Sequence, residues 1–284
     1  MVAALSLSVD IHVERGGVSH SPMKATINGI EIDYRDAGSG APVVFIHAFP
    51  LNQSMWDDQF SYLRDQCRVI SLDLRGFGRS DAPHSAYSID EMALDVRGLM
   101  TALEIDRAVL AGLSMGGYIA LAFFRNYPEA VRGLVLADTR AGADTPEARE
   151  RRLTSALKAE REGSRAIGED MVPLLLGRTT LETRSSVVER VRTMIEGNSP
   201  QGIAGAQRAM AERRDSTNML SVIDVPVLIV VGSEDTLTPV AEAEGMQNGI
   251  RGALLRIIDD AGHLSNLEQP EEFNAALIDF IASA

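Results

Sequence analysis

The chain has 284 residues, 45% of them hydrophobic, which is enough for one large α/β domain or for a core with an inserted subdomain. Its formal net charge of −13 argues against nucleic acid or an anionic membrane as a partner. Cys67 is the only cysteine, so no disulfide forms within the chain, and we expect a reducing, cytoplasmic location. No apolar run reaches membrane-spanning length.

Residues 1–22 are interpreted as an N-terminal extension. Apolar and polar residues alternate strictly from Leu5 to Val13, a two-residue period that predicts a half-buried strand. A lone strand is not stable in water, so it is expected to pair with the edge of its own sheet or with the same segment of a second subunit. The protein is therefore expected to be a monomer or a homodimer.

Residues 23–140 alternate between strand and helix patterns and form the first part of an α/β core. Lys24–Tyr34 is typical of a hairpin, with a turn at Asn28-Gly29. Further on, continuous apolar runs predict buried strands at Pro42–Ile46, Arg68–Leu72, Ala108–Ala111 and Val131–Ala137. Helical patterns lie between them. This order predicts right-handed crossovers and a mostly parallel central sheet flanked by helices.

The pattern changes over residues 141–216, where only helical patterns follow a favourable helix start at Thr145-Pro146. We expect a helical cap inserted into the core and lying over its functional edge. The apolar candidates for its inner, substrate-binding side are Leu174, Leu175, Met194 and Met210. Residues 217–284 form the second part of the core, with two more strands and a terminal helix that begins at Pro270.

The pentapeptide Gly112-Leu113-Ser114-Met115-Gly116 lies between a predicted strand and a predicted helix. In that context Gly-x-Ser-x-Gly indicates a nucleophile elbow, with Ser114 on a strained turn and glycines where side chains would meet neighbouring backbone. The backbone N–H of Met115 is one predicted donor to an oxyanion. The second is predicted to be the N–H of Phe49, in the loop after the Pro42–Ile46 strand.

A serine nucleophile needs a base, and the base needs an orienting acid. His263 follows the last predicted strand and comes after Ser114, as the chain order Ser…Asp…His requires. Asp235 is the favoured acid because it directly follows the strand before. Asp138 is the second candidate and Glu234 the third.

His47 ends a strand at the same sheet edge, and we assign it a structural role in fixing its loop.

Five motifs in this order resemble the α/β-hydrolase superfamily, from about Met23 to the C-terminus. They are His47-Ala48-Phe49-Pro50, the Asp-x-Arg-Gly-x-Gly-x-Ser pattern over residues 73–80, the Gly112–Gly116 elbow, Gly232-Ser233-Glu234-Asp235 and Gly262-His263. Ala48 departs from the family pattern, which has glycine in this loop. The chain is similar to small carboxylesterases, enol-lactonases of aromatic breakdown and cofactor-free perhydrolases.

The resemblance implies a serine hydrolase that cleaves small carboxylic esters through an acyl-enzyme. The alternatives are an enol-lactonase, with Arg140 as the cation for a substrate carboxylate, a perhydrolase side activity suggested by Pro50, and a small-ligand receptor of the same fold. Gly76-Phe77-Gly78 lacks the third glycine of a dinucleotide motif, and His-Glu-x-x-His is absent from the sequence. We therefore expect no cofactor and no metal, and a small ester or lactone as the binding partner.

Overall fold

The computed structural model describes residues 23–83 and 85–283. The predicted extension over residues 1–22, with its strand at residues 5–13, lies outside the described residues.

In the described part of the chain, eight strands form one sheet, in the order β1-β2-β4-β3-β5-β6-β7-β8. They are β1 Met23–Ile27, β2 Ile30–Ala37, β3 Pro42–Ile46, β4 Arg68–Leu72, β5 Ala108–Leu113, β6 Val131–Ala137, β7 Val227–Gly232 and β8 Leu254–Ile258. The β1–β2 and β2–β4 pairs are antiparallel, and the pairs from β4 to β8 are parallel. The predicted α/β architecture, with its mostly parallel sheet, is confirmed.

The hairpin that opens the sheet turns at Asn28-Gly29, as predicted. Both residues have positive φ, 50° and 80°, which is the backbone that a two-residue turn between twisted strands requires. The register places Ile27 opposite Ile30.

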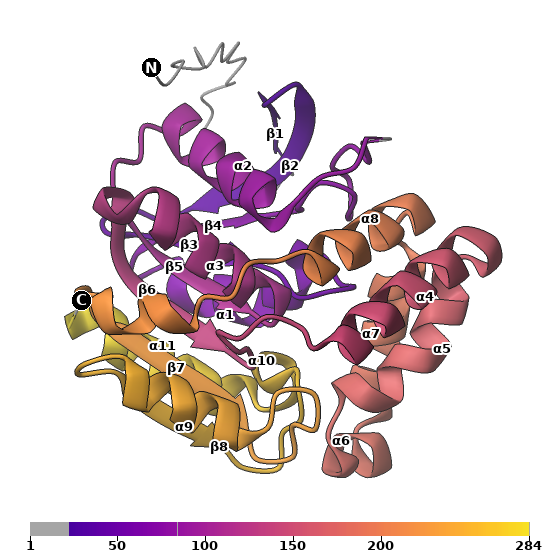
Figure 1. Ribbon diagram of the computed structural model, residues 1–284. Coiled ribbons are helices and arrows are strands. Elements are labelled where there is room, and N and C mark those ends of the chain that lie inside the picture. Colours follow the sequence, from indigo (N-terminus) through magenta and orange to yellow (C-terminus); the bar gives the residue numbers. More distant parts are fainter. Residues whose placement is uncertain (1–22, 84, 284) are drawn as a thin grey trace.

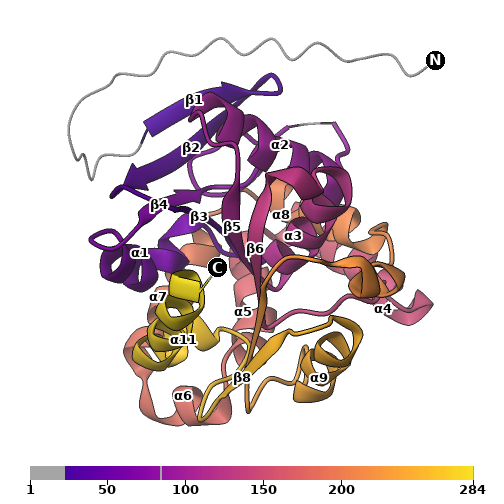
Figure 2. The same cartoon turned by 90° about the vertical axis from the view of Figure 1, so that its left-hand side faces the viewer.

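Helices cover both faces of the sheet (Figure 2). On one face lie α1 Asp57–Leu63 and α11 Pro270–Ser283, and on the other lie α2 Ile89–Ala102, α3 Met115–Asn126 and α9 Val240–Gly249. The short helix α10 Ser265–Glu268 precedes α11, and 3-10 turns occupy Gln53–Trp56, Pro128–Ala130 and Thr217–Val222. Because strands such as β3 and β5 are buried on both faces, each layer of helices packs on its own hydrophobic cluster.

Helices α4 to α8 lie between β6 and β7 in the sequence and pack beside the core (Figure 1). We call them the cap helices: α4 Pro146–Glu162, α5 Ser164–Leu175, α6 Arg178–Thr183, α7 Ser185–Glu196 and α8 Pro200–Ala211. Asn198, between α7 and α8, anchors them to the core. Its buried amide donates to the carbonyls of Pro50 and Leu51 at 2.7 and 3.1 Å and accepts from the Gly78 N–H at 2.7 Å.

None of the helices in residues 23–83 and 85–283 combines the length and the apolar character needed to cross a membrane.

Candidate active site

Ser114 lies at the turn between β5 and α3: β5 ends at Leu113, and α3 begins at Met115. Its φ of 56° and ψ of −113° lie in a region that residues with a side chain rarely adopt. A Cβ atom at Gly112 would lie 2.2 Å from the Gly116 carbonyl oxygen, and one at Gly116 would lie 2.1 Å from that of Ile46. The close backbone approach therefore requires both glycines, and it holds Ser114 at the carboxyl edge of the sheet.

His263 lies between Ser114 and Asp235. Its Nε2 is 2.7 Å from Ser114 Oγ, and its Nδ1 is 2.8 Å from Asp235 Oδ2. Asp235 follows β7 and His263 follows β8, so both reach the same sheet edge as Ser114. All of these side chains are buried. A hydroxyl nucleophile, a base and an orienting carboxylate require this order of contacts.

Asp235 is held as a carboxylate. Its Oδ1 accepts from the backbone N–H groups of Leu237 and Thr238 at 2.8 and 3.0 Å, and its Oδ2 accepts from the Thr238 hydroxyl at 2.6 Å. Burial by itself raises the pKa of Asp235, but the charge of His263 and the hydrogen bonds from His263 and Thr238 outweigh burial and hold the pKa below its ordinary value. An ionised Asp235 keeps the Nδ1–H of His263 pointed toward itself.

Asp138 and Glu234, the other candidate acids, bind elsewhere. Asp138 Oδ1 accepts from the Gly232 N–H at 2.9 Å, and its Oδ2 accepts from the Ser265 hydroxyl at 2.5 Å. Burial and the nearby charge of Asp235 raise the pKa of Asp138 well above its ordinary value. Glu234 accepts from the N–H and hydroxyl of Thr179, at 2.9 and 2.7 Å. Both carboxyl groups therefore connect loops rather than contact the imidazole of His263.

The backbone N–H groups of Phe49 and Met115 are the predicted oxyanion donors. Phe49 lies in the loop after β3 and lines the same cavity as Ser114, whereas Met115 is the first residue of α3. In the described residues, neither N–H donates to a backbone or side-chain acceptor. Both donors are free to bind a negative oxygen near Ser114, where the N-terminal end of α3 also favours negative charge.

A cavity of about 80 Å³ opens beside Ser114 and His263. Its other lining residues come from the core and from the cap helices, and they are Phe49, Tyr118, Arg140, Arg152, Met171, Leu175, Met210, Leu237 and Thr238. The lining is mixed: about half of its side chains are apolar, and the polar ones include two guanidinium groups. Such a space suits a small group that has an apolar part and a polar or anionic end.

The structure places some of the predicted cap residues at this cavity and moves others away. Leu175, Met210 and Arg140 line it. Leu174 does not line it: its side chain is 46% exposed, on the outer side of α5. Successive residues of a helix point about 100° apart, so Leu174 and Leu175 face different sides. Met194 is buried in the hydrophobic cluster that includes Val191, and it does not line the cavity either. The expectations for Leu174 and Met194 are therefore corrected.

Several lining residues were not singled out from the sequence. Tyr118 lies four residues after Ser114, one helical turn along α3, and Met171 lies four residues before Leu175 on α5. Helical spacing from a predicted site residue is the signal that could have found both. Arg152 carries no such signal, because its place in the wall depends on how α4 packs.

Comparisons with known proteins identify the family of this chain. A family model described as the alpha/beta hydrolase fold matches residues 41–270. The chain belongs to the α/β hydrolase family. A thermophilic esterase from Thermogutta terrifontis, solved with malate bound, is 41% identical with a TM-score of 0.90, over 93% of this chain and 98% of that one.

Enol-lactonases are also similar to this hydrolase. The enol-lactonase from Burkholderia xenovorans LB400 is 30% identical with a TM-score of 0.86, over 92% of this chain and 100% of that one. The 3-oxoadipate enol-lactonase 2 from Acinetobacter baylyi is 29% identical over 262 residues, which are 92% of this chain and 96% of the relative.

His47 connects two loops of the hydrolase. Its Nδ1 lies 2.9 Å from the Ala48 carbonyl oxygen, and its Nε2 accepts from the Leu74 N–H at 3.0 Å. Complete burial lowers the pKa of His47 to about 4, so the ring is neutral at pH 7. With both ring nitrogens bound to backbone, His47 fixes the Phe49 loop, in the structural role assigned to it from the sequence.

Glu268, which sequence reasoning missed, connects the His263 loop of the hydrolase to the cap helices. Its Oε1 accepts from the N–H groups of Gly262 and Leu264, on either side of His263, at 2.9 and 3.2 Å. Its Oε2 accepts from the Gly177 N–H, between α5 and α6, at 2.8 Å. Burial raises the pKa of Glu268 despite these hydrogen bonds.

Proposed function

We propose that this hydrolase cleaves small carboxylic esters, with Ser114 as nucleophile, His263 as general base and acid, and Asp235 as the orienting acid. The observation that carries the proposal is the hydrogen-bonded line from Ser114 Oγ through His263 to Asp235, with separations of 2.7 and 2.8 Å. The similarity of this chain to an esterase and to enol-lactonases, over more than nine-tenths of its length, supports ester hydrolysis in general.

In the proposed reaction, His263 Nε2 takes the proton from Ser114 Oγ as the oxygen attacks the ester carbonyl carbon. The carbonyl oxygen becomes negative and accepts hydrogen bonds from the Phe49 and Met115 N–H groups. The tetrahedral intermediate then expels the alcohol, which receives the proton from His263. Water, deprotonated by His263, attacks the acyl-enzyme and releases the carboxylic acid.

The test compares kcat/KM for p-nitrophenyl acetate in the natural protein, Ser114→Ala and Ser186→Ala. Ser114→Ala is expected to lose activity by roughly 10⁶-fold, the scale that loss of a nucleophile reaches in serine proteases. Ser186, exposed on α7, is the matched control and is expected to leave activity within about twofold. The absence of Ser114-dependent release would refute the assignment and favour the small-ligand receptor.

The second candidate is an enol-lactonase, and Arg140 is the observation that favours it. Arg140 lines the cavity, and in the described residues its buried Nε has no hydrogen-bond partner. Its contacts with Leu237 and Glu242 are long: Nη2 lies 3.4 Å from the Leu237 carbonyl oxygen, and Nη1 lies 3.8 Å from Glu242. A guanidinium group with unused donors beside Ser114 is suited to a substrate that carries a free carboxylate.

A substrate panel separates these candidates. It contains p-nitrophenyl acetate, a simple lactone and an enol-lactone that carries a carboxylate. If the enol-lactone is a substrate, Arg140→Gln is expected to lower kcat/KM for it by about tenfold and to leave p-nitrophenyl acetate nearly unchanged. No turnover of the enol-lactone by the natural protein would reject the second candidate. Oxidation assays with acetate and hydrogen peroxide on the same proteins would detect the perhydrolase side activity.

A further inference from the structure

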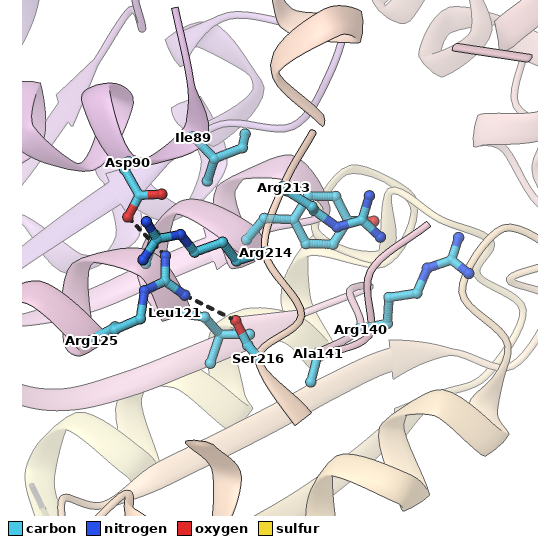
Figure 3. A pocket seen from close by; sticks show the side chains of 11 residues that line it. Ile89, Asp90, Leu121, Arg125, Arg140, Ala141, Arg213, Arg214 and Ser216 are labelled. Carbon is cyan, nitrogen blue, oxygen red and sulfur yellow. Dashed lines mark hydrogen bonds and ion pairs between the residues drawn. The ribbon is translucent and has the colours of Figure 1, made fainter. Parts of the chain in front are cut away.

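A second pocket, which shares Tyr118 and Arg140 with the cavity beside Ser114, is lined by several arginines (Figure 3). They come from distant parts of the sequence: Arg125 from α3, Arg140 from the segment after β6, and Arg213 and Arg214 from the segment after α8. Asp90, at the start of α2, is the carboxylate among the lining residues. This concentration of positive charge stands out in a chain whose formal net charge is −13.

Arg140 and Arg213 each have an anionic partner that does not line the pocket. Arg213 is buried, forms an ion pair with Asp144 at 2.8 Å, and lies 4.1 Å above the Tyr118 ring. Arg140 lies 3.8 Å from Glu242. Figure 3 shows Arg140 and Arg213 on one side of the pocket, and Arg125, Arg214 and Asp90 on the other.

On the Asp90 side, positive charge exceeds negative charge. Arg125 Nη2 donates to Asp90 Oδ1 at 2.8 Å. Arg214 is exposed, and in the described residues its side chain donates no hydrogen bond, although its charge acts on Asp90. Among the lining residues of this wall, two guanidinium groups therefore face one carboxylate.

The pocket also has donors without acceptors. In the described residues, the buried Nε of Arg125 has no hydrogen-bond partner. Arg125 Nη1 reaches the Ser216 hydroxyl only at 3.4 Å, and this buried hydroxyl donates no hydrogen bond within the described residues. Guanidinium and hydroxyl groups that converge in this way are typical ligands of a carboxylate or phosphate.

We propose that this pocket binds a small oxyanion, a carboxylate or phosphate group, between Arg125, Arg214 and Ser216. The enclosed part measures about 10 Å³, room for about one oxygen atom, so the rest of the anion lies at the mouth beside Arg214. This site requires no ester chemistry and is independent of the proposed function.

Bound anion would join the core to the segment through which the chain returns from the cap helices. Arg125 belongs to core helix α3, whereas Arg214 and Ser216 belong to the return segment. That segment lies against residues 141–143, through which the chain leaves the core: Ser216 N–H donates to the Ala141 carbonyl at 2.9 Å, and Arg213 Nη2 donates to the Gly142 carbonyl at 2.8 Å. An anion would therefore stabilise both crossings between core and cap.

The experiment measures the melting temperature against the concentration of inorganic phosphate and, separately, of acetate, with ionic strength held constant by sodium chloride in Tris buffer. For the natural protein we expect a saturable rise in melting temperature with at least one of the two anions, and the more effective anion identifies the ligand class. Arg214→Gln is expected to raise the half-saturating concentration by about tenfold. Arg251→Gln, which removes another exposed arginine, is the matched control and is expected to behave as the natural protein does.

Asp90→Asn gives a second test, in which the half-saturating anion concentration is expected to change in the opposite direction. It removes the carboxylate that competes for Arg125 and Arg214, so the half-saturating concentration is expected to fall several-fold. The proposal is overturned if neither anion gives a saturable rise, if Arg214→Gln responds as the natural protein does, or if Asp90→Asn weakens the response.

Discussion

Burial and the charge of His263 act in opposite directions on the pKa of Asp235, and the net effect lowers it. The carboxylate accepts hydrogen bonds from His263 and Thr238 that an amide could not all replace. Asp235→Asn is expected to lower kcat for p-nitrophenyl acetate by about 10⁴-fold, because the amide would favour the wrong tautomer of the imidazole. Steady-state kinetics on well-folded protein, verified by circular dichroism, measures this loss.

The control for Asp235 is Asp138→Asn. Asp138 binds Gly232 and Ser265 rather than His263, so its substitution is expected to lower stability more than kcat. If Asp138→Asn reduced the chemical step more than Asp235→Asn in a folded protein, the orienting acid would be Asp138.

His47 gives the hydrolase a pH dependence of stability. Its pKa is about 4 in the folded protein and about 6.5 when unfolded, so between these values the unfolded state binds the additional proton. The free energy of unfolding should therefore fall as the pH decreases from 6.5 to 4, by up to about 3 kcal/mol from this residue. Urea denaturation at a series of pH values measures it.

The matched variant is His47→Gln, whose side chain does not titrate. Carboxyl groups with raised pKa values, such as those of Asp138 and Glu268, contribute to both proteins, and the difference between the two curves isolates His47. Parallel curves for the natural protein and His47→Gln would contradict the prediction.

Among helices and loops, the turn between α7 and α8 connects the cap helices to the core through Asn198. Removing the Asn198 side chain leaves the Pro50 and Leu51 carbonyls and the Gly78 N–H unpaired in a buried place. Asn198→Ala is expected to lower the free energy of unfolding by about 1–3 kcal/mol.

The same variant should also lower kcat. Asn198 binds the carbonyl of Pro50, and Pro50 directly follows Phe49, whose N–H is a predicted oxyanion donor. Asn198→Asp, which keeps an acceptor for Gly78 but loses the donors, serves as the comparison. Denaturation and esterase kinetics measured on both variants test this pair of effects. Natural stability and natural kcat in Asn198→Ala would show that the cap is held by other contacts.

The elements that the sequence predicts are those with a local signal. A strand buried on both faces is a continuous apolar run, as in Pro42–Ile46, and Ser88 and Glu91 have the spacing of the capping box that opens α2. Helix α10 has no such pattern, because Ser265–Glu268 owes its place to the contacts of a buried carboxyl group. It could not be predicted from periodicity.

In the candidate site, too, the residues with a local sequence signal could be predicted and the others could not. Chain order and motif spacing lead to Ser114, Asp235 and His263, the residues that lie hydrogen-bonded in the structure. The cap side could not be assigned, because choosing Leu175 over Leu174 requires the rotation of α5 about its axis. That rotation is set by packing against α4 and α7, which the residue pattern of α5 alone does not give.

For the molecule as a whole, the cavity beside Ser114 is small for its proposed task. Ligand pockets commonly enclose about 300–1,000 Å³, whereas this cavity measures about 80 Å³, and Ser114 is only 8% exposed. Its walls include α5 and α8, which belong to the cap helices. We therefore expect substrates and products larger than the cavity to pass when these helices move.

Solvent friction then becomes part of the catalytic cycle. Motions of packed helices displace water, and they slow as the medium becomes more viscous, whereas bond rearrangement inside the cavity does not. For an ester with a fast chemical step, kcat is expected to fall as sucrose raises the viscosity, and for a slow ester it should stay constant. If kcat for both esters were independent of viscosity, the helix motion would be faster than the chemical step for both. A viscosity-sensitive kcat would make the mobility of α5 and α8, rather than the strength of the nucleophile, the property that limits turnover of the best substrates.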